Sequence, residues 1–108
     1  MGTIVEKKDE HILVCLSSSP TNKKIISTAA KMAGVFHARF TALYVQTGAE
    51  TISADKERLE AHIRYAEESG AEIVMTHGED VALQIAEYAH LSGVTKIVIG
   101  QSSVIKSH

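Results

Sequence analysis

Residues 39–46, with the sequence RFTALYVQ, are apolar on both faces of the strand that they would form. One face carries Phe40, Ala42 and Tyr44, and the other carries Thr41, Leu43 and Val45. A strand of this kind is typical of a parallel sheet that helices cover on both sides. The segment therefore indicates an α/β fold.

The rest of the chain alternates short apolar segments with stretches of helical periodicity. The expected strands are 11–16, 39–46, 71–77 and 95–99, and the expected helices begin near Ser19-Pro20 and cover 53–69 and 81–92. The side chains expected to be buried are Ile25, Ala29, Met32, Ala33 and Phe36 in the first helix, Leu59, Ile63 and Ala66 in the second, and Val81, Ile85, Tyr88 and Ala89 in the third. This βαβαβαβ order predicts an open, Rossmann-like parallel sheet in a three-layer α/β/α arrangement with right-handed crossovers. We expect four strands in the order 3-2-1-4.

With 108 residues, the chain has room for one small domain. Residues 1–10 are polar and charged, which is typical of a linker or a disordered N-terminus. The domain is therefore expected over 11–103, followed by a tail at 104–108.

The charge and the apolar runs exclude several classes of function. The formal net charge is −2, so no basic surplus favours binding to a nucleic acid. The longest apolar runs are too short for a transmembrane helix or a signal peptide, so we expect no direct insertion into a membrane. Cys15 is the single cysteine, is expected in the core, and fits a reducing, cytoplasmic setting.

Two polar turns are the candidate ligand site. The first strand ends at Ser17-Ser18-Ser19 and leads through Asn22 into a helix, and the last strand ends at Gly100-Gln101-Ser102-Ser103. With strand order 3-2-1-4, both turns lie at the edge where ligands bind in open α/β sheets. Hydroxyl groups before a helix N-terminus suit a phosphate. The alternative is that these serines and this glycine only form turns.

Motifs for catalysis and for metals are missing from the sequence. It has no P-loop, no Gly-x-Gly-x-x-Gly turn and no Gly-x-Ser-x-Gly elbow. His62 and His90 are expected at solvated helix positions, while His77, which ends the third strand, is the one histidine expected near the ligand edge. Glu79-Asp80 is interpreted as a helix cap. We therefore expect no catalytic residues, no metal and no required cofactor.

Four segments carry a resemblance to a known family: ILVCLSSSP, FTALYV, DVALQIAEYA and SGVTKIVIGQS. They resemble the universal stress protein domain, which has an adenine nucleotide alpha hydrolase-like fold. More narrowly, they are similar to the domain in the cytoplasmic region of potassium-sensing sensor histidine kinases of the KdpD family. The resemblance implies a regulatory, non-catalytic module in two-component potassium or osmotic signalling, on the cytoplasmic side of the membrane.

Some members of that family bind cyclic di-AMP through a Ser-x-Ser motif, twenty residues, and Phe-Thr-Ala-x-Tyr. Here Ser17-Ser18-Ser19 and Phe40-Thr41-Ala42-Leu43-Tyr44 have the same identities and spacing. The resemblance implies that Ser17 and Ser19 contact the ligand, and that Phe40, Thr41, Ala42 and Tyr44 shape its site. An aromatic ring there could stack on adenine. The alternative is that Phe40 and Tyr44 are core residues of the strand.

The chain departs from ATP-binding universal stress proteins at two places. Those proteins have an aspartate where this chain has Ser17, and a second glycine after the one that corresponds to Gly100. Tight ATP binding is therefore not expected. The fifth strand that is usual in this family is also missing, so strand 95–99 is expected at the edge of the sheet. The sequence therefore does not decide whether the chain forms a homodimer.

Three functions follow, in order of preference. The first is a nucleotide-binding regulatory module whose partners are a small adenine nucleotide, cyclic di-AMP above all, and the other cytoplasmic domains of the same sensor kinase. The second is an ATP-binding universal stress protein. The third is a docking domain of the kinase that binds no ligand.

Overall fold

The computed structural model describes residues 10–48 and 52–99. The elements follow the order β1 (His11–Cys15), α1 (Asn22–Phe36), β2 (Arg39–Gln46), α2 (Ser53–Glu68), β3 (Glu72–His77), α3 (Val81–Ser92) and β4 (Lys96–Val98). The alternation of strands and helices agrees with the sequence prediction. The predictions for the linker, for the 100–103 turn and for the 104–108 tail lie outside the described residues, apart from Glu10.

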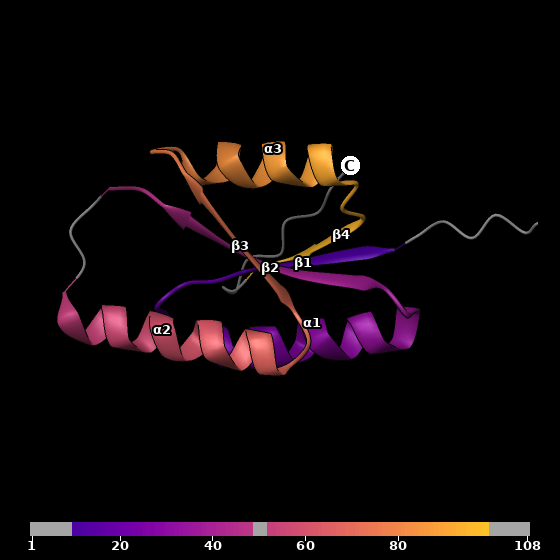
Figure 1. Cartoon of the computed structure of the whole chain (residues 1–108), viewed down its shortest axis with the longest axis horizontal. Coiled ribbons are helices and arrows are strands. Elements are labelled where there is room, and N and C mark those ends of the chain that lie inside the picture. The colour runs from indigo at the N-terminus through magenta and orange to yellow at the C-terminus, as the bar shows by residue number, and fades with distance from the viewer. Residues whose placement is uncertain (1–9, 49–51, 100–108) are drawn as a thin grey trace, which may run out of the picture.

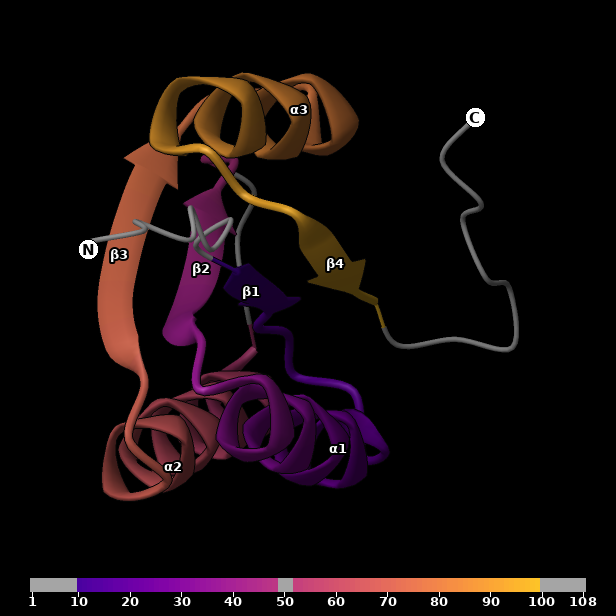
Figure 2. The same ribbon diagram turned by 90° about the vertical axis from the view of Figure 1, so that its right-hand side faces the viewer.

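The four strands form one parallel sheet in the order β3-β2-β1-β4, which confirms the predicted topology. Val14 of β1 lies beside Ala42 of β2 on one side and beside Val98 of β4 on the other. Helices α1 and α2 cover one face of the sheet, and α3 lies on the opposite face (Figure 1 and Figure 2). This arrangement follows from the two directions of the right-handed crossovers.

The main core lies between the sheet and the α1–α2 layer. Its buried members are Ile12, Val14, Leu16, Ile26, Ala29, Ala33, Phe40, Ala42, Leu59, Ala66 and Ala71. In β2 the four residues 40–43 are buried, so both faces of this strand are covered as its sequence predicts. The buried strand β2 holds its neighbour β1 in place. The candidate site lies directly after β1.

Helix α1 begins later than the sequence predicts. Thr21 is its N-cap residue, and the Thr21 side chain makes no capping hydrogen bond. Ser19, near which the helix was predicted to begin, lies outside it, and its hydroxyl accepts from the Thr21 amide at 3.3 Å. The helix ends at Phe36, and the C-cap residue His37 has φ 51° and ψ 45° and donates its amide to the Gly34 carbonyl at 3.4 Å.

Phe36 is 44% exposed, so the prediction that it is buried is wrong. It is the last residue of α1, and the Lys96 ammonium lies 4.7 Å from the centre of its ring. Ile26, which is not among the side chains predicted to be buried, is fully buried. Ile25 and Met32 are partly buried against the same core.

Helix α3 has the predicted bounds, with Asp80 Oδ1 accepting from the Leu83 amide at 3.1 Å and Gly93 as the C-cap. None of its residues is buried, which contradicts the burial predicted for Val81, Ile85, Tyr88 and Ala89. Within the described residues this is the one helix on its face of the sheet, so its sides stay open (Figure 2). An open apolar cavity of about 850 Å³ lies beside it, lined mainly by residues of α3 and of 94–99.

No helix within the described ranges is both long and apolar enough to span a bilayer.

Candidate functional site

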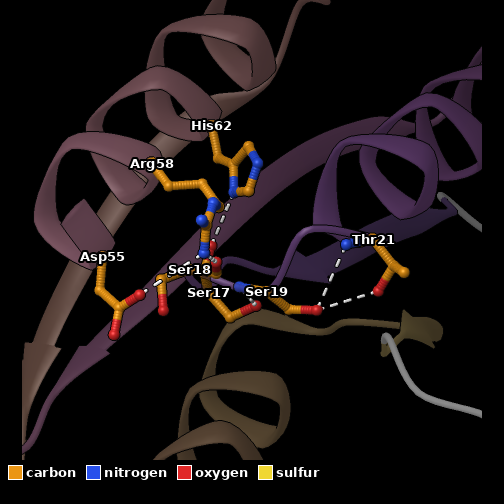
Figure 3. Close-up of polar contacts among 7 residues, drawn as sticks. All are labelled: Ser17, Ser18, Ser19, Thr21, Asp55, Arg58 and His62. Carbon is orange, nitrogen blue, oxygen red and sulfur yellow. Dashed lines mark hydrogen bonds and ion pairs between the residues drawn. The ribbon is translucent and has the colours of Figure 1, made fainter.

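The serine turn, Ser17-Ser18-Ser19, leaves the carboxyl end of β1 and leads to α1 (Figure 3). The Leu16 amide donates to the Leu43 carbonyl at 2.8 Å, which is the last contact of this segment with β2 before the turn. Ser17 is exposed, while Ser18 and Ser19 are partly buried. The turn therefore lies at the sheet edge that the topology predicts for a ligand.

Asn22 holds the turn from inside. Its side chain is 1% exposed, its Oδ1 accepts from the Ser17 amide at 3.2 Å, and its Nδ2 donates to the Cys15 carbonyl at 3.0 Å. These two bonds satisfy backbone groups that β1 leaves unpaired where it ends. Asn22, a predicted ligand-binding residue, is thus placed in the interior of the site as its support.

The hydroxyl groups of the turn are linked in sequence. The Ser19 amide donates to Ser17 Oγ at 3.2 Å, and the Thr21 amide donates to Ser19 Oγ at 3.3 Å. Ser19 Oγ also lies 3.0 Å from Thr21 Oγ1. Such bonds from a hydroxyl to the amide two residues later stabilise turns. The turn is therefore shaped by its own side chains, whether or not a ligand is bound.

Helix α2 holds the turn from outside through two carbonyl groups. His62 Nδ1 lies 2.8 Å from the Ser17 carbonyl, and Arg58 Nη1 donates to the Ser18 carbonyl at 3.0 Å (Figure 3). Arg58 Nη1 also lies 3.5 Å from Asp55 Oδ1. Since a carbonyl only accepts, the proton of this contact is on His62 Nδ1.

His62 is 6% exposed, so the prediction of a solvated position is wrong. It follows Leu59 by three residues and precedes Ala66 by four, which puts it on the buried face of α2. This spacing is the signal in the sequence that indicates a buried His62. The contact of Arg58 with the turn has no such signal, because nothing in the order of residues connects 58 with 18.

The amide and the hydroxyl of Ser18 have no hydrogen-bond partner among the described residues. The turn's carbonyl groups at Ser17 and Ser18 are occupied by α2, whereas these two donors stay available. Unpaired donors next to a helix N-terminus attract an anion. The turn can therefore bind a phosphate without rearrangement of its carbonyl contacts.

The four predicted site residues of β2 differ in exposure. Phe40 and Ala42 belong to the core, and Thr41 is fully buried with its Oγ1 2.8 Å from His11 Nε2. Tyr44 is partly exposed. Because Cys15 lies beside Leu43, Tyr44 is one residue further along β2, toward the edge where the serine turn begins. Of the four, Tyr44 has the most accessible side chain.

His77 ends β3 and is paired with Gln46 of β2. It is exposed at the same sheet edge, but β2 separates it from β1, so it lies two strand spacings, about 10 Å, from the line of β1. Gly100, Gln101 and Ser102 lie outside the described residues. The structure thus places Asn22 against the serine turn, and Tyr44 on the neighbouring strand one residue beyond the pairing of Cys15 with Leu43.

The chemistry of the described site favours binding. His62 directs its Nδ1 proton to a backbone carbonyl and not to a serine hydroxyl, so it does not activate Ser17 as a nucleophile. Burial raises the pKa of the Cys15 thiol from 9.0 to about 11, which keeps it protonated at neutral pH. Within 10–48 and 52–99, no three His, Cys, Asp or Glu residues are grouped as metal ligands.

The chain matches no established model of a protein family. It is 47% identical over 100 residues to the sensor protein KdpD of Clostridium acetobutylicum, an alignment that covers 93% of this chain and 11% of that protein. The chain therefore spans about a tenth of the length of this relative.

Solved structures of universal stress proteins share the fold. One from Burkholderia pseudomallei has a TM-score of 0.70 and 24% identity, covering 90% of this chain and 85% of its own. The universal stress protein from Archaeoglobus fulgidus in complex with dAMP has a TM-score of 0.59 and 22% identity, covering 87% of this chain and 82% of its own.

Proposed function

We propose, from the premise that this chain is a universal stress protein-like domain homologous to part of a KdpD sensor protein, that it binds an adenine nucleotide as a regulatory module. The ligand that we propose first is cyclic di-AMP. The module performs no reaction. Binding alters how the domain packs on its neighbours in a longer sensor kinase, and so changes the kinase's activity.

One observation supports this proposal above the others. Helix α2 binds the carbonyl groups of Ser17 and Ser18, and Asn22 accepts from the Ser17 amide. The amide and the hydroxyl of Ser18 stay available among the described residues. A site with fixed donors loses little conformational entropy when an anion binds. This arrangement suits the phosphate of a nucleotide better than it suits a turn whose role is only to connect two elements.

The choice of cyclic di-AMP depends on the resemblance of two segments to a family motif. Those segments are 17–19, which follows β1, and 40–44, which lies on β2; the register of these neighbouring strands pairs Cys15 with Leu43. Tyr44 keeps part of its surface accessible on the second strand. A base stacked on this ring would contribute about 1–3 kcal/mol.

A second candidate is ATP or another mononucleotide. The universal stress protein from Archaeoglobus fulgidus is described in complex with dAMP, which makes a mononucleotide a reasonable ligand for the fold. The presence of Ser17 where ATP-binding members have an aspartate argues against tight ATP binding. A docking role without a ligand remains the third candidate.

Isothermal titration calorimetry on the 108-residue chain separates the three candidates. We expect saturable binding of cyclic di-AMP, weaker binding of ATP and dAMP, and a loss of at least tenfold in affinity in Ser19→Ala and Tyr44→Ala. Ser27→Ala, a serine of α1 outside the turn, is the control. Binding of ATP alone favours the second candidate. Absence of heat with all three nucleotides overturns the proposal.

The setting of this module is also part of the proposal. We propose that the parent protein is a KdpD-type sensor histidine kinase of potassium or osmotic signalling, and that this domain lies on the cytoplasmic side and contacts other domains of that kinase. Autophosphorylation of the longer protein, with and without cyclic di-AMP, tests this role. If Ser19→Ala in the longer protein leaves a nucleotide effect unchanged, the regulatory site is elsewhere.

A further inference from the structure

We propose that Arg58 of α2 is the residue that contacts the ligand's phosphate at the serine turn, and that Asp55 lowers the affinity by competing for the same guanidinium. This inference rests on the proposed function, because it assigns the charged group of that site. It concerns residues outside the Ser-x-Ser and Phe-Thr-Ala-x-Tyr segments.

Arg58 already reaches the turn in the unliganded domain. Its Nη1 donates to the Ser18 carbonyl at 3.0 Å, and its side chain is 41% exposed (Figure 3). Among the described residues, the remaining N–H groups of this guanidinium have no partner beyond Asp55. The group is therefore anchored at one corner and keeps donors for a ligand at the surface.

The residue that Arg58 contacts is also the residue with available donors. Ser18 gives its carbonyl to Arg58, while the Ser18 amide and hydroxyl are unpartnered in the described part of the chain. A guanidinium beside a free amide offers the planar donors that a phosphate accepts in pairs. Helix α1 adds its N-terminal dipole on the other side of the turn.

Two lysines, Lys23 and Lys24, lie in the first turn of α1, and Lys23 is directed elsewhere. The Lys23 ammonium lies 4.9 Å from the centre of the ring of Tyr65, a residue of α2 that follows Arg58. A lysine held over an aromatic ring gives up part of that contact if it moves to a phosphate. Arg58 is the cation for which the structure records a bond to the turn itself.

Asp55 is a weak partner for Arg58 and can be replaced by a ligand. The 3.5 Å separation is long for a charge-assisted bond, and both side chains are about two-fifths exposed, so the pair is well screened. A phosphodiester at the serine turn carries the same single negative charge as the Asp55 carboxylate, and its two non-bridging oxygens can accept from Arg58 at shorter range than the 3.5 Å of the present pair. Asp55 repels the same phosphate, which gives its removal a predictable sign.

Affinity measurements with three probes on matched variants test the assignment. The probes are cyclic di-AMP, AMP and adenosine, which has no phosphate. We expect Arg58→Gln to lose about tenfold or more in affinity for the two phosphate-bearing probes, with a weaker dependence on salt, and to keep its affinity for adenosine. Lys56→Gln, an exposed cation on the same helix, controls for net charge.

The second pair of variants tests the competition. Asp55→Asn is expected to bind cyclic di-AMP and AMP more tightly, whereas Glu57→Gln, an exposed carboxylate with the same change of charge, is expected to have less effect. Equal losses for AMP and adenosine in Arg58→Gln would mean that Arg58 only supports the fold. Equal effects of Arg58→Gln and Lys56→Gln would also overturn the assignment.

Titration with inorganic phosphate, followed by the amide resonance of Ser18, distinguishes this failure from failure of the proposed function. A Ser18 shift that disappears in Arg58→Gln, without any nucleotide binding, supports the anion site and overturns the nucleotide module. Nucleotide binding that is the same in Arg58→Gln and wild type overturns the role of Arg58 alone. No response to phosphate or to nucleotides overturns both.

Discussion

The imidazole of His62 donates from Nδ1 to the backbone carbonyl of Ser17 across 2.8 Å, and so joins the middle of α2 to the end of β1. Arg58, one helical turn earlier, makes the parallel contact with Ser18. Any ligand that shifts the serine turn therefore acts on two points of α2. In the proposed function, α2 is therefore the helix whose position a bound ligand would change.

Replacing His62 by alanine is expected to lower the free energy of unfolding by about 1–3 kcal/mol, because the Ser17 carbonyl loses its donor where α2 covers it. Urea denaturation followed by circular dichroism measures this change. His62→Asn, whose amide can reach a similar position, should recover part of the loss. His90→Ala, at an exposed position of α3, is the control. A His62→Ala variant as stable as this control would show that the bond contributes nothing.

Asn22 is expected to be more sensitive than the serines that surround it. Asn22→Ala leaves the Cys15 carbonyl and the Ser17 amide without their partner at a buried position, at a cost of about 2–4 kcal/mol in unfolding free energy. Asn22→Asp keeps an acceptor for Ser17 but places an oxygen against the Cys15 carbonyl. We expect Asn22→Asp to unfold at lower urea than wild type at pH 7, and to regain stability at acidic pH as the carboxyl group is protonated. A pH-independent midpoint for Asn22→Asp would contradict this view of the contact.

Variants of Thr41 test whether this motif residue affects the stability of the core and not contact with the ligand. His11 Nδ1 lies 3.1 Å from the Ser92 carbonyl, which only accepts, so in the neutral imidazole Nε2 accepts the hydroxyl proton of Thr41 at 2.8 Å. Thr41→Val removes that donor beside a histidine that is 2% exposed, and should cost about 1–3 kcal/mol in stability.

Thr41→Ser retains the hydroxyl and serves as the comparison for this variant. At a temperature where both variants are folded, we expect them to bind nucleotide alike. A loss of affinity in folded Thr41→Val, with unchanged stability, would instead place Thr41 in contact with the ligand.

The Cys15 thiol should make stability depend on alkaline pH. Its pKa is raised from 9.0 to about 11 by burial, so the folded state resists ionisation that the unfolded chain accepts. The contribution of this group is complete below pH 9 and is lost as the pH rises through about 11, by roughly 2–3 kcal/mol in all.

Unfolding of wild type and Cys15→Ala at several pH values from 8 to 11 measures this effect. The difference between the two proteins should shrink with pH. In parallel, a thiol reagent at pH 8 should label the native protein slowly and the urea-unfolded protein fast. Rapid labelling of the native state would mean that Cys15 is accessible and its pKa ordinary.

The sequence predicted the topology well because the relevant signals are local. The apolar faces of β2 and the glycine that ends α3 each act within their own element. The start of α1 was misplaced because Ser19 and Thr21 compete for the same role, and the choice depends on how Asn22 is held by Cys15 and Ser17. That choice involves contacts between elements, which residue order alone does not contain.

The site was predictable in part for the same reason. The serines after β1 and the aromatic residue on β2 are visible as motifs, whereas the burial of Phe40 and Thr41 depends on how α1, α2 and α3 cover the sheet. His62 lies more than forty positions from Ser17 in the chain, and Arg58 lies forty positions from Ser18. The failure at Phe36 and at the face of α3 has a related cause, since helical spacing shows which side is apolar but not whether anything covers it.

His37, the C-cap residue of α1, has a left-handed backbone conformation, which makes it a position where a substitution can stabilise the domain. Glycine adopts this conformation without steric cost, so His37→Gly should raise the melting temperature through a gain of about 1 kcal/mol. The position is at the opposite end of α1 from the serine turn. This gain offsets part of the destabilisation expected for Asn22→Ala, so more of that variant stays folded. Loss of ligand binding can then be told apart from loss of structure in one and the same sample.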